Sequence, residues 1–194
     1  HLLTVAPLVL EAQRAVTLSL MLYPTLQTPA TQTLLSFGKF ALELNPQGGV
    51  TLRAGAAAVS TPGAVALRQW ARVQATVETS GRMTILLEDV SVLSTQTQAQ
   101  TQAQTKAYSE GRGAVDLIQK EVVLIAAAPG PKGPVGAVSC FNGKIEAPQI
   151  TADGSVIAAW DFAHNISGMT VPAQTGPDFI LVNAPTRAVT GAFW

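Results

Sequence analysis

Asp161 and His164 are the first pair of side chains in this sequence whose types and spacing could do chemistry. They stand three positions apart after Trp160, and a carboxylate and an imidazole at that separation could ligate a metal ion or act as acid and base. The chain has only two histidines, and the other one, His1, is terminal. We therefore favour a structural role, a hydrogen bond in the loop after a strand, and predict no metal or catalytic residue.

Aromatic side chains offer a second kind of chemistry, because their faces can stack on sugar rings. Four residues are candidates for such a platform: Tyr23, Trp70, Tyr108 and Trp160. Aromatic residues are only 6% of the chain, so we expect both tryptophans to pack in the core. Tyr108 lies in a polar stretch with Glu110 and Arg112, and the sequence predicts that it is the most exposed of the four. Tyr108 and Arg112 thus join Asp161 and His164 as candidate ligand or interface residues.

Two turns and one cysteine are the remaining features with ligand or nucleophile chemistry. The turn at Asp153-Gly154 and the one at 45–49 are rich in carbonyl groups and could bind Ca²⁺, but too few carboxylates cluster there. Plain turns are the favoured interpretation. Cys140 is the only cysteine, and beside Phe141 we expect it to be a small buried hydrophobic side chain. The sequence predicts no cofactor.

The composition argues against two classes of partner. Lys and Arg number 12 and Asp and Glu number 12 in 194 residues, so no net charge steers the chain to nucleic acid or an anionic membrane. The longest apolar run, 122–128, is far shorter than a membrane span. A single cysteine gives no support to an oxidising compartment, so we expect a cytoplasmic location. The start at His1 lacks an initiator methionine and a signal peptide, which suggests a segment cut from a longer chain.

Apolar residues alternate with polar ones in many short runs, which is the pattern of half-buried strands. Val16, Leu18, Leu20 and Leu22 are expected to face one side of such a strand. Val73, Ala75 and Val77 are expected to face inward in a hairpin that turns at 79–81. Further strands are predicted at 33–37, 40–44, 50–53, 65–70, 83–88, 121–127, 135–141, 156–162 and 179–182. Hydrophobic residues make up 47% of the chain, enough for a sandwich with a substantial core.

Four segments are predicted with less regular structure. Residues 2–13 could form an edge strand, 54–63 a loop of small residues, and 114–120 a short helix. The Gln/Thr/Ala tract within 95–113 has no apolar face, so we expect an excursion that is mobile or draped over the surface.

A hairpin is predicted over 139–150, with its turn at Asn142-Gly143, because Asn-Gly tolerates the positive φ angles of a tight turn.

The order of these strands resembles that of the concanavalin A-like, laminin-G-like jelly rolls. The residues that carry the resemblance are Leu22-Tyr23-Pro24-Thr25, Gln32-Thr33-Leu34-Leu35-Ser36, Phe40-Ala41-Leu42-Glu43-Leu44, the strand with Trp70, and Phe141-Asn142-Gly143-Lys144-Ile145-Glu146. The match covers about residues 10–150. It implies an all-β fold, a two-sheet antiparallel jelly-roll sandwich of the lectin and glucanase type.

Enzymes of this fold that hydrolyse glycans place their acids close together on one strand, in the pattern Glu-x-Asp-x-x-Glu. Glu43, Glu78 and Glu88 lie on expected strand faces, but the pattern is missing and Glu88-Asp89 does not supply it. The sequence therefore predicts that this chain is not itself an enzyme.

The C-terminal residues narrow the resemblance. Residues 157–162, Ile166-Ser167 and 183–194 are similar to the segment after the lectin-like domain in the N,N-dimethylformamidase large (beta) subunit family. Between Gly168 and Asp178 the chain departs from that family, which has a histidine there. The resemblance implies that residues 1–155 form the sandwich and that 156–194 are a strand and tail leading to a domain missing from this chain.

Two functions follow from these observations. The first is a non-catalytic accessory domain that packs against a catalytic domain or other subunits of the same protein. In the family it resembles, the iron centre with tyrosine and glutamate ligands lies in the following domain, and no residue of this chain matches it. The alternative is a carbohydrate-binding, lectin-like module with a glycan as its partner, which rests on the fold alone.

Overall fold

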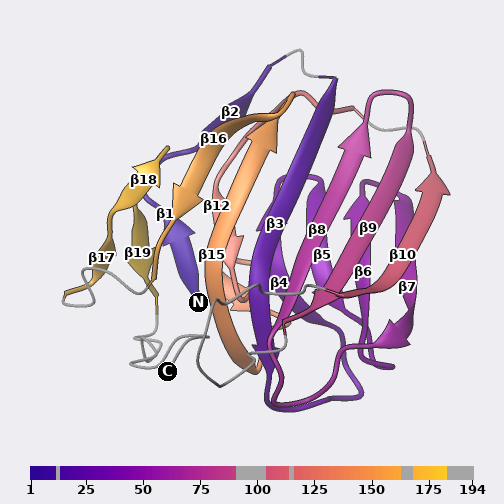
Figure 1. Ribbon diagram of the computed structural model, residues 1–194. Coiled ribbons are helices and arrows are strands. Elements are labelled where there is room, and N and C mark those ends of the chain that lie inside the picture. The colour runs from indigo at the N-terminus through magenta and orange to yellow at the C-terminus, as the bar shows by residue number, and fades with distance from the viewer. Residues whose placement is uncertain (12–13, 91–103, 114–115, 163–167, 183–194) are drawn as a thin grey trace, which may run out of the picture.

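The chain folds into two antiparallel β-sheets that pack face to face as a jelly-roll sandwich (Figure 1). The computed structural model describes residues 1–11, 14–90, 104–113, 116–162 and 168–182. Nineteen strands lie in these ranges, and no residue within them is helical. Accordingly, the described segments include no helix that could cross a membrane. The all-β sandwich is the fold class that the sequence predicts, because strands with one apolar face must bury it against another layer.

The first sheet has eight strands. In spatial order they are β17 (Thr170–Val171), β19 (Phe179–Leu181), β1 (Leu2–Thr4), β12 (Val123–Ile125), β4 (Gln32–Phe37), β5 (Phe40–Leu44), β6 (Gly49–Ala54) and β7 (Ala57–Ala64). Phe40, Leu42 and Leu44 alternate inward and are buried. The turn after them is closed by Asn45, whose Oδ1 accepts hydrogen bonds from the backbone N–H groups of Gln47 and Gly49. The strands predicted at 40–44 and 50–53 and the plain turn between them are confirmed: they form the β5–β6 hairpin, with an Asn side chain as its clasp.

The second sheet has seven strands. In spatial order they are β10 (Gln104–Arg112), β9 (Arg82–Asp89), β8 (Ala71–Glu78), β3 (Ala15–Pro24), β15 (Gly143–Ala152), β16 (Ser155–Trp160) and β18 (Ala173–Thr175). The inward residues of β3 and β8 are those that the alternation predicts, and each is at most 2% exposed. The predicted β8–β9 hairpin is also confirmed.

Trp160 lies at the centre of one end of the core. Its ring packs against Phe179 with centroids 4.2 Å apart, and its Nε1 donates a hydrogen bond of 2.8 Å to the carbonyl of Pro177. Because Trp160 belongs to the seven-stranded sheet and Phe179 to the eight-stranded one, this contact joins the two layers. The predicted core role of Trp160 is confirmed by its 1% exposure.

Two short ribbons and one closed side complete the sandwich. β2 (Leu8–Leu10) pairs with β11 (Gln119–Glu121), and β13 (Ala128–Gly130) pairs with β14 (Gly133–Val138). At one side β10 lies beside β7, so the two sheets close on each other there (Figure 1). A Cβ at Gly113 would collide with the Cβ of Ala57, so a glycine permits this approach.

The predicted hairpin at Asn142-Gly143 is wrong. β14 pairs with β13, whereas β15 begins at Gly143 and pairs with β3 and β16. The real turn is Asp153-Gly154, where both residues have positive φ (49° and 82°), as tight hairpin turns require. Asn142 instead donates its backbone N–H and its side-chain amide to Gln32 Oε1. The alternation after Asn142 fits any neighbouring strand, and only the assembled sheet selects β3.

Residues 54–70 also differ from the prediction. Most of the expected loop at 54–63 lies in β7, which pairs with β6, while the expected strand at 65–70 is a turn region that ends before Ala71. Small residues give a weak strand signal by themselves, but the backbone hydrogen bonds to β6 do not depend on side-chain size.

Three further expectations are corrected. Gln104–Arg112 forms β10 along the full length of β9 rather than a mobile or draped excursion, and its polar composition suits an edge strand. The predicted helix at 114–120 is absent from the part that is described, 116–120, where β11 begins at Gln119. β1 is no edge strand, because it lies between β12 and β19. The rest of the tract, 95–103, lies outside the described residues.

Cys140 is exposed, so the expectation of a buried thiol is wrong. It follows Ser139, which has a positive φ of 53°, in the connection from β14 to β15. This connection runs outside the eight-stranded sheet, with a single bridge from Cys140 to Thr33. Phe141, the next residue, is partly buried against the core, so the neighbour in sequence does not show whether Cys140 itself is buried.

Candidate functional site

The outer face of the seven-stranded sheet carries its side chains in rows that run across the strands. The register of β9, β8, β3 and β15 places one residue from each strand in each row. The aromatic row consists of Val90, Trp70, Tyr23 and Lys144. The charged row consists of Glu88, Arg72, Met21 and Glu146. Two neutral rows follow: Leu86, Gln74, Ser19 and Gln149, and then Thr84, Thr76, Thr17 and Thr151. Figure 1 looks onto this face.

The aromatic row is built around Tyr23 and Trp70. Their ring centroids are 5.4 Å apart with the planes tilted by 49°, and the Lys144 ammonium lies 5.5 Å from the centre of the Tyr23 ring, within the range of a cation–π contact. Both aromatic side chains are half-buried. The expectation that Trp70 packs in the core is therefore corrected: it precedes β8 at a position that faces outward, opposite Tyr23.

The charged row lies directly beside the aromatic row. Arg72 is exposed, and Glu88 and Glu146 are half-buried. Arg72 stands opposite Glu88 on one side and Met21 on the other. Guanidinium and carboxylate groups in the row next to the aromatic rings can exchange hydrogen bonds with the hydroxyl groups of a molecule that rests on the rings.

The neutral rows continue the face with hydroxyl and amide groups. The Oγ1 atoms of Thr17 and Thr76 are 2.9 Å apart and share a hydrogen bond. Ser19, Gln74 and Gln149 stand in the adjoining row. This part of the face is polar and uncharged, in contrast to the row beside it.

Of the residues singled out from the sequence, Tyr23 and Trp70 are brought together, whereas Tyr108, Arg112 and Asp161 lie apart from one another or from that pair. The backbone of Tyr108 pairs with Leu86 at one edge of the sheet, and Arg112, also in β10, is exposed opposite Arg82. Asp161 is half-buried after β16, which is four strands away from β9, and His164 lies outside the described residues. The expected structural role of Asp161 and His164 in the loop after β16 therefore stays a prediction. The sequence contained a signal for the aromatic row that was not used: Tyr23 shares its parity with the outward Thr17 and Ser19.

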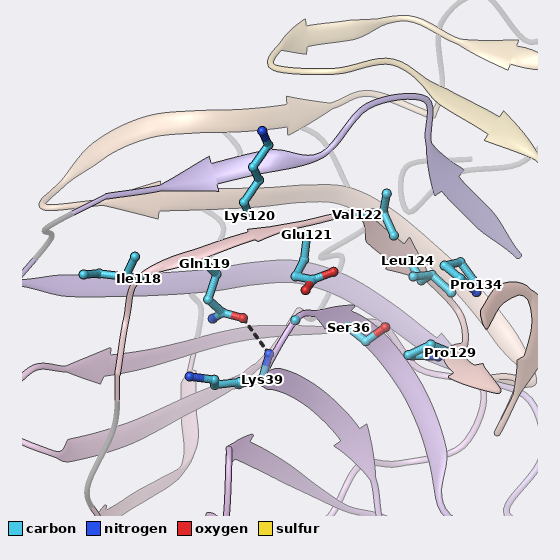
Figure 2. A pocket seen from close by; sticks show the side chains of 11 residues that line it. Ser36, Lys39, Ile118, Gln119, Lys120, Glu121, Val122, Leu124, Pro129 and Pro134 are labelled. Carbon is cyan, nitrogen blue, oxygen red and sulfur yellow. Dashed lines mark hydrogen bonds between the residues drawn. The ribbon is translucent and has the colours of Figure 1, made fainter. Parts of the chain in front are cut away.

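A depression of about 530 Å³ lies on the opposite, eight-stranded side of the sandwich (Figure 2). Its lining includes Ser36, Lys39, Gln119, Glu121, Pro129 and Pro134. Leu124 also lines it, and the register places Leu124 beside Ser36 on the outer face of that sheet. The lining thus combines aliphatic side chains, including two prolines, with polar side chains from separate segments of the chain.

Gln119 is one of two buried polar residues of this depression, with 7% of its surface exposed against 4% for Ser36. Its Oε1 accepts a hydrogen bond of 2.6 Å from the backbone N–H of Lys39 (Figure 2). Gly38 has a φ of 54°, and a Cβ there would overlap Gln119 Oε1. Gln119 Nε2 is fully buried and has no partner among the described residues, so it does not face a ligand in the depression. Gln119 is a clasp between β11 and the β4–β5 turn.

The rim of the depression carries an exposed ion pair. Lys39 Nζ donates to Asp116 Oδ2 at 3.1 Å, and both side chains are more than half exposed. The backbone N–H of Ile118 and then Lys39 lower the pKa of Asp116, because both stabilise the ionised carboxylate. Exposed pairs of this kind contribute little to stability.

The carboxylates of Glu43, Glu78 and Asp153 lie on different segments of the described part of the chain. Glu43 accepts a hydrogen bond from Arg53 on the eight-stranded sheet, whereas Glu78 accepts one from Ser80 on the seven-stranded sheet. Asp153 Oδ1 accepts the backbone N–H groups of Arg14 and Ala15 at 2.8 and 2.9 Å. Within the described ranges, no group of three or more His, Cys, Asp or Glu side chains is placed to hold a metal ion.

Comparison of the fold gives a likeness, while comparison of the sequence does not. No protein-family model and no curated protein matches the chain. A candidate carbohydrate-binding protein from Bacteroides ovatus overlaps 93% of the chain at a TM-score of 0.64 and 10% identity. The overlap covers 55% of that protein, so the chain spans about half its length.

Two other structures overlap less well. The carbohydrate-binding module CBM40 of a Ruminococcus gnavus sialidase, bound to α2,3-sialyllactose, has a TM-score of 0.47 at 18% identity and covers 72% of the chain and 76% of the module. Domains LG4-5 of the mouse laminin α1 chain have a TM-score of 0.47 at 12% identity and cover 90% of the chain and 45% of the laminin fragment. The strand order together with the Bacteroides overlap defines the class of the chain: it has a concanavalin A-like jelly-roll fold.

Proposed function

We propose that this chain is a non-catalytic carbohydrate-binding module whose binding surface is the outer face of the seven-stranded sheet. The observation that carries the proposal is the half-buried Tyr23–Trp70 pair, flanked by Lys144 and the charged row. Aromatic rings offer an apolar face to the C–H groups of a sugar, and adjacent charged side chains hydrogen-bond its hydroxyl groups. The likeness to a candidate carbohydrate-binding protein supports this choice of ligand class by analogy of fold.

The proposal is tested by screening the purified protein on a broad glycan array, followed by titration with the strongest ligand. Trp70→Ala is expected to weaken that binding about tenfold, because an aromatic contact contributes ~1 kcal/mol beyond its buried area. Lys120→Gln is the control, since Lys120 is exposed on the rim of the opposite depression and its loss leaves the affinity unchanged. An array without a single bound glycan, or wild-type affinity in Trp70→Ala, removes the proposal.

The second candidate is an accessory domain of a protein similar to the N,N-dimethylformamidase large subunit. It is carried by the similarity of residues 157–162 and 183–194 to the segment after the lectin-like domain of that family. The domain would pack against a catalytic domain or other subunits of a cytoplasmic protein. The two candidates are compatible, because an accessory domain can also bind a glycan.

The accessory role has its own test. The purified chain is expected to fold and to leave N,N-dimethylformamide intact, and the natural gene is expected to continue past Trp194 into a domain with tyrosine and glutamate metal ligands. Turnover of the amide by the chain alone, or a stop codon directly after Trp194, contradicts this role. Neither result bears on glycan binding.

A further inference from the structure

We infer that the ligand of this face is an uncharged, extended oligosaccharide that lies across the strands, with consecutive sugar units on β8, β3 and β15. The inference rests on the proposed function and specifies its ligand. It comes from three features of the rows: their direction, their charge and their open ends.

The direction of the aromatic row sets the direction of the ligand. Trp70, Tyr23 and Lys144 follow one another from β8 to β3 to β15, and neighbouring strands lie ~4.8 Å apart. The Trp70 and Tyr23 centroids are separated by 5.4 Å, a step comparable to one pyranose unit of an extended chain. A chain that runs along the strands would leave the aromatic row after a single unit, whereas a chain across them meets a new side chain at each unit.

The charged row runs parallel to the aromatic row on the same strands, so the sugar units on β8 and β15 each have a charged neighbour, whereas the unit on β3 lies beside Met21. Glu88 stands on β9, Arg72 on β8 and Glu146 on β15. Carboxylates accept the hydrogen bonds that sugar hydroxyls donate, and the guanidinium donates to their oxygens. Stacking on one row and hydrogen bonding to the next row therefore act on the same chain of sugars.

The balance of charge argues for a neutral ligand. The two rows contain two cations, Arg72 and Lys144, and two carboxylates, Glu88 and Glu146, which occupy both ends of the charged row. An acidic sugar placed beside Arg72 would also lie one strand from Glu88, and one placed beside Lys144 would lie two residues from Glu146 on the same strand; like charges at such separations repel. Uncharged hydroxyl groups meet no such opposition.

The open ends of the rows argue for internal units of a chain rather than a single terminal sugar. Among the described residues, the first half of β15, 143–146, pairs only with β3, because β16 begins to pair at Gln149. A bulge at Ala147, with a φ of 45°, separates the two halves. The depression described above belongs to the opposite sheet. Because no described strand pairs with residues 143–146 on this side, a bound sugar chain can continue past β15.

The inference is tested with ladders of neutral oligosaccharides from one to six units, cello-, xylo- and manno-oligosaccharides, titrated by NMR so that millimolar dissociation constants are measured. The affinity of at least one ladder is expected to rise about tenfold or more between one and three units and to level off beyond about three, the number of strands that carry a sugar unit. Oligogalacturonides of the same lengths form the anionic arm and are expected to bind more weakly.

Two variants place the sugar units on the strands. Lys144→Met is expected to weaken the trisaccharide several-fold and to leave the monosaccharide unchanged, because only the longer ligand reaches β15. Trp70→Phe keeps an aromatic ring at the first position and is expected to retain the length dependence. Lys120→Met, on the opposite face, is the matched control for the loss of a lysine. Thermal unfolding of each variant confirms that it is folded.

The outcomes separate the inference from the function on which it rests. Equal affinity for one and six units, or tighter binding of the anionic ladder, overturns the inference and leaves a carbohydrate-binding module. Length dependence that persists unchanged in Lys144→Met overturns the placement across the strands. Failure to bind any sugar, on the array and in the ladders alike, overturns the proposed function itself.

Discussion

The polar residues on the outer faces of the two sheets differ in their exposure to solvent. On the seven-stranded sheet, residues such as Thr17, Gln74 and Thr151 are half-buried or exposed. On the eight-stranded sheet, all six residues of β4 are buried, including Thr33 and Ser36. The reason is that the chain after β12 covers β4: Ser36 Oγ donates to the carbonyl of Ala127, while the Ser139 carbonyl beside the strand accepts the N–H of Thr33.

This difference separates polar groups that serve the fold from polar groups that can serve a ligand. A polar group under a cover must find its partner inside the protein, since leaving it unpaired costs free energy. A polar group on an open face exchanges hydrogen bonds with water and can pass them to a ligand. We therefore expect substitutions on the covered face to change stability and substitutions on the open face to change binding.

Gly38→Ala on the covered side is expected to have the largest effect. A methyl group at Gly38 meets Gln119 Oε1 and forces a side chain into positive φ, so the unfolding free energy should fall by about 2–4 kcal/mol. Gly55→Ala is the matched control, because Gly55 also has positive φ (62°) but nothing lies within 4 Å of its Cβ position. Denaturant unfolding measures both, and equal losses would show that the Gln119 clasp plays no part.

Gln119→Met tests the clasp itself. The Lys39 N–H loses its acceptor, which should lower the unfolding free energy by up to about 1.5 kcal/mol. Gln74→Met, on the open face, is expected to change it by less than ~0.5 kcal/mol. The same denaturant titration compares the two, and a stability gain in Gln119→Met would mean that relief of the unpaired Nε2 outweighs the lost hydrogen bond.

Thr33→Val is expected to stabilise the protein, contrary to most substitutions. Thr33 is 0% exposed and its Oγ1 has no partner among the described residues, so replacing the hydroxyl by a methyl group of similar shape should add about 1 kcal/mol. Thr17→Val on the open face lacks this gain, because the Thr17 hydroxyl is half-buried and bonded to Thr76. A higher melting temperature for Thr17→Val than for Thr33→Val would contradict the comparison.

The smallest effect concerns pH. The pKa of Asp116 is lowered in the folded state by the Ile118 N–H and by Lys39, so its contribution to stability is present above its unfolded pKa and is lost as the pH falls through the folded one. Asp116→Asn should therefore be slightly less stable than wild type at pH 7 and equal to it in acid, once the pH lies well below the folded pKa of Asp116. Added salt should shrink the difference at pH 7, and a difference that persists in acid would exclude the carboxylate as its source.

The local sequence pattern was sufficient to predict the inward residues and the pairing of those strands whose neighbours in space are also their neighbours in sequence. The alternation in Val16 to Leu22 and in Val73 to Val77 fixed which side chains enter the core, and the turns at 45–49 and 79–81 fixed the partners of β5 and β8. The all-β class follows from these hairpins, because each leaves one apolar face to be covered. Parity also placed Tyr23 on the outward face, although only Trp70 at the opposing position makes it a platform.

The tertiary structure alone decided the long-range pairings and the sites that depend on them. An alternation of period two is the same whichever strand lies alongside, so it could not show that β15 joins β3 across more than a hundred residues, or that the polar segment 104–112 completes an edge. The Tyr23–Trp70–Lys144 row and the Gln119 clasp each combine residues from distant segments. In β3 and β8 the sequence by itself determined which residues face inward, and the folded sheet decided which outward residues stand together, because strand partners are selected by the packing of the whole core.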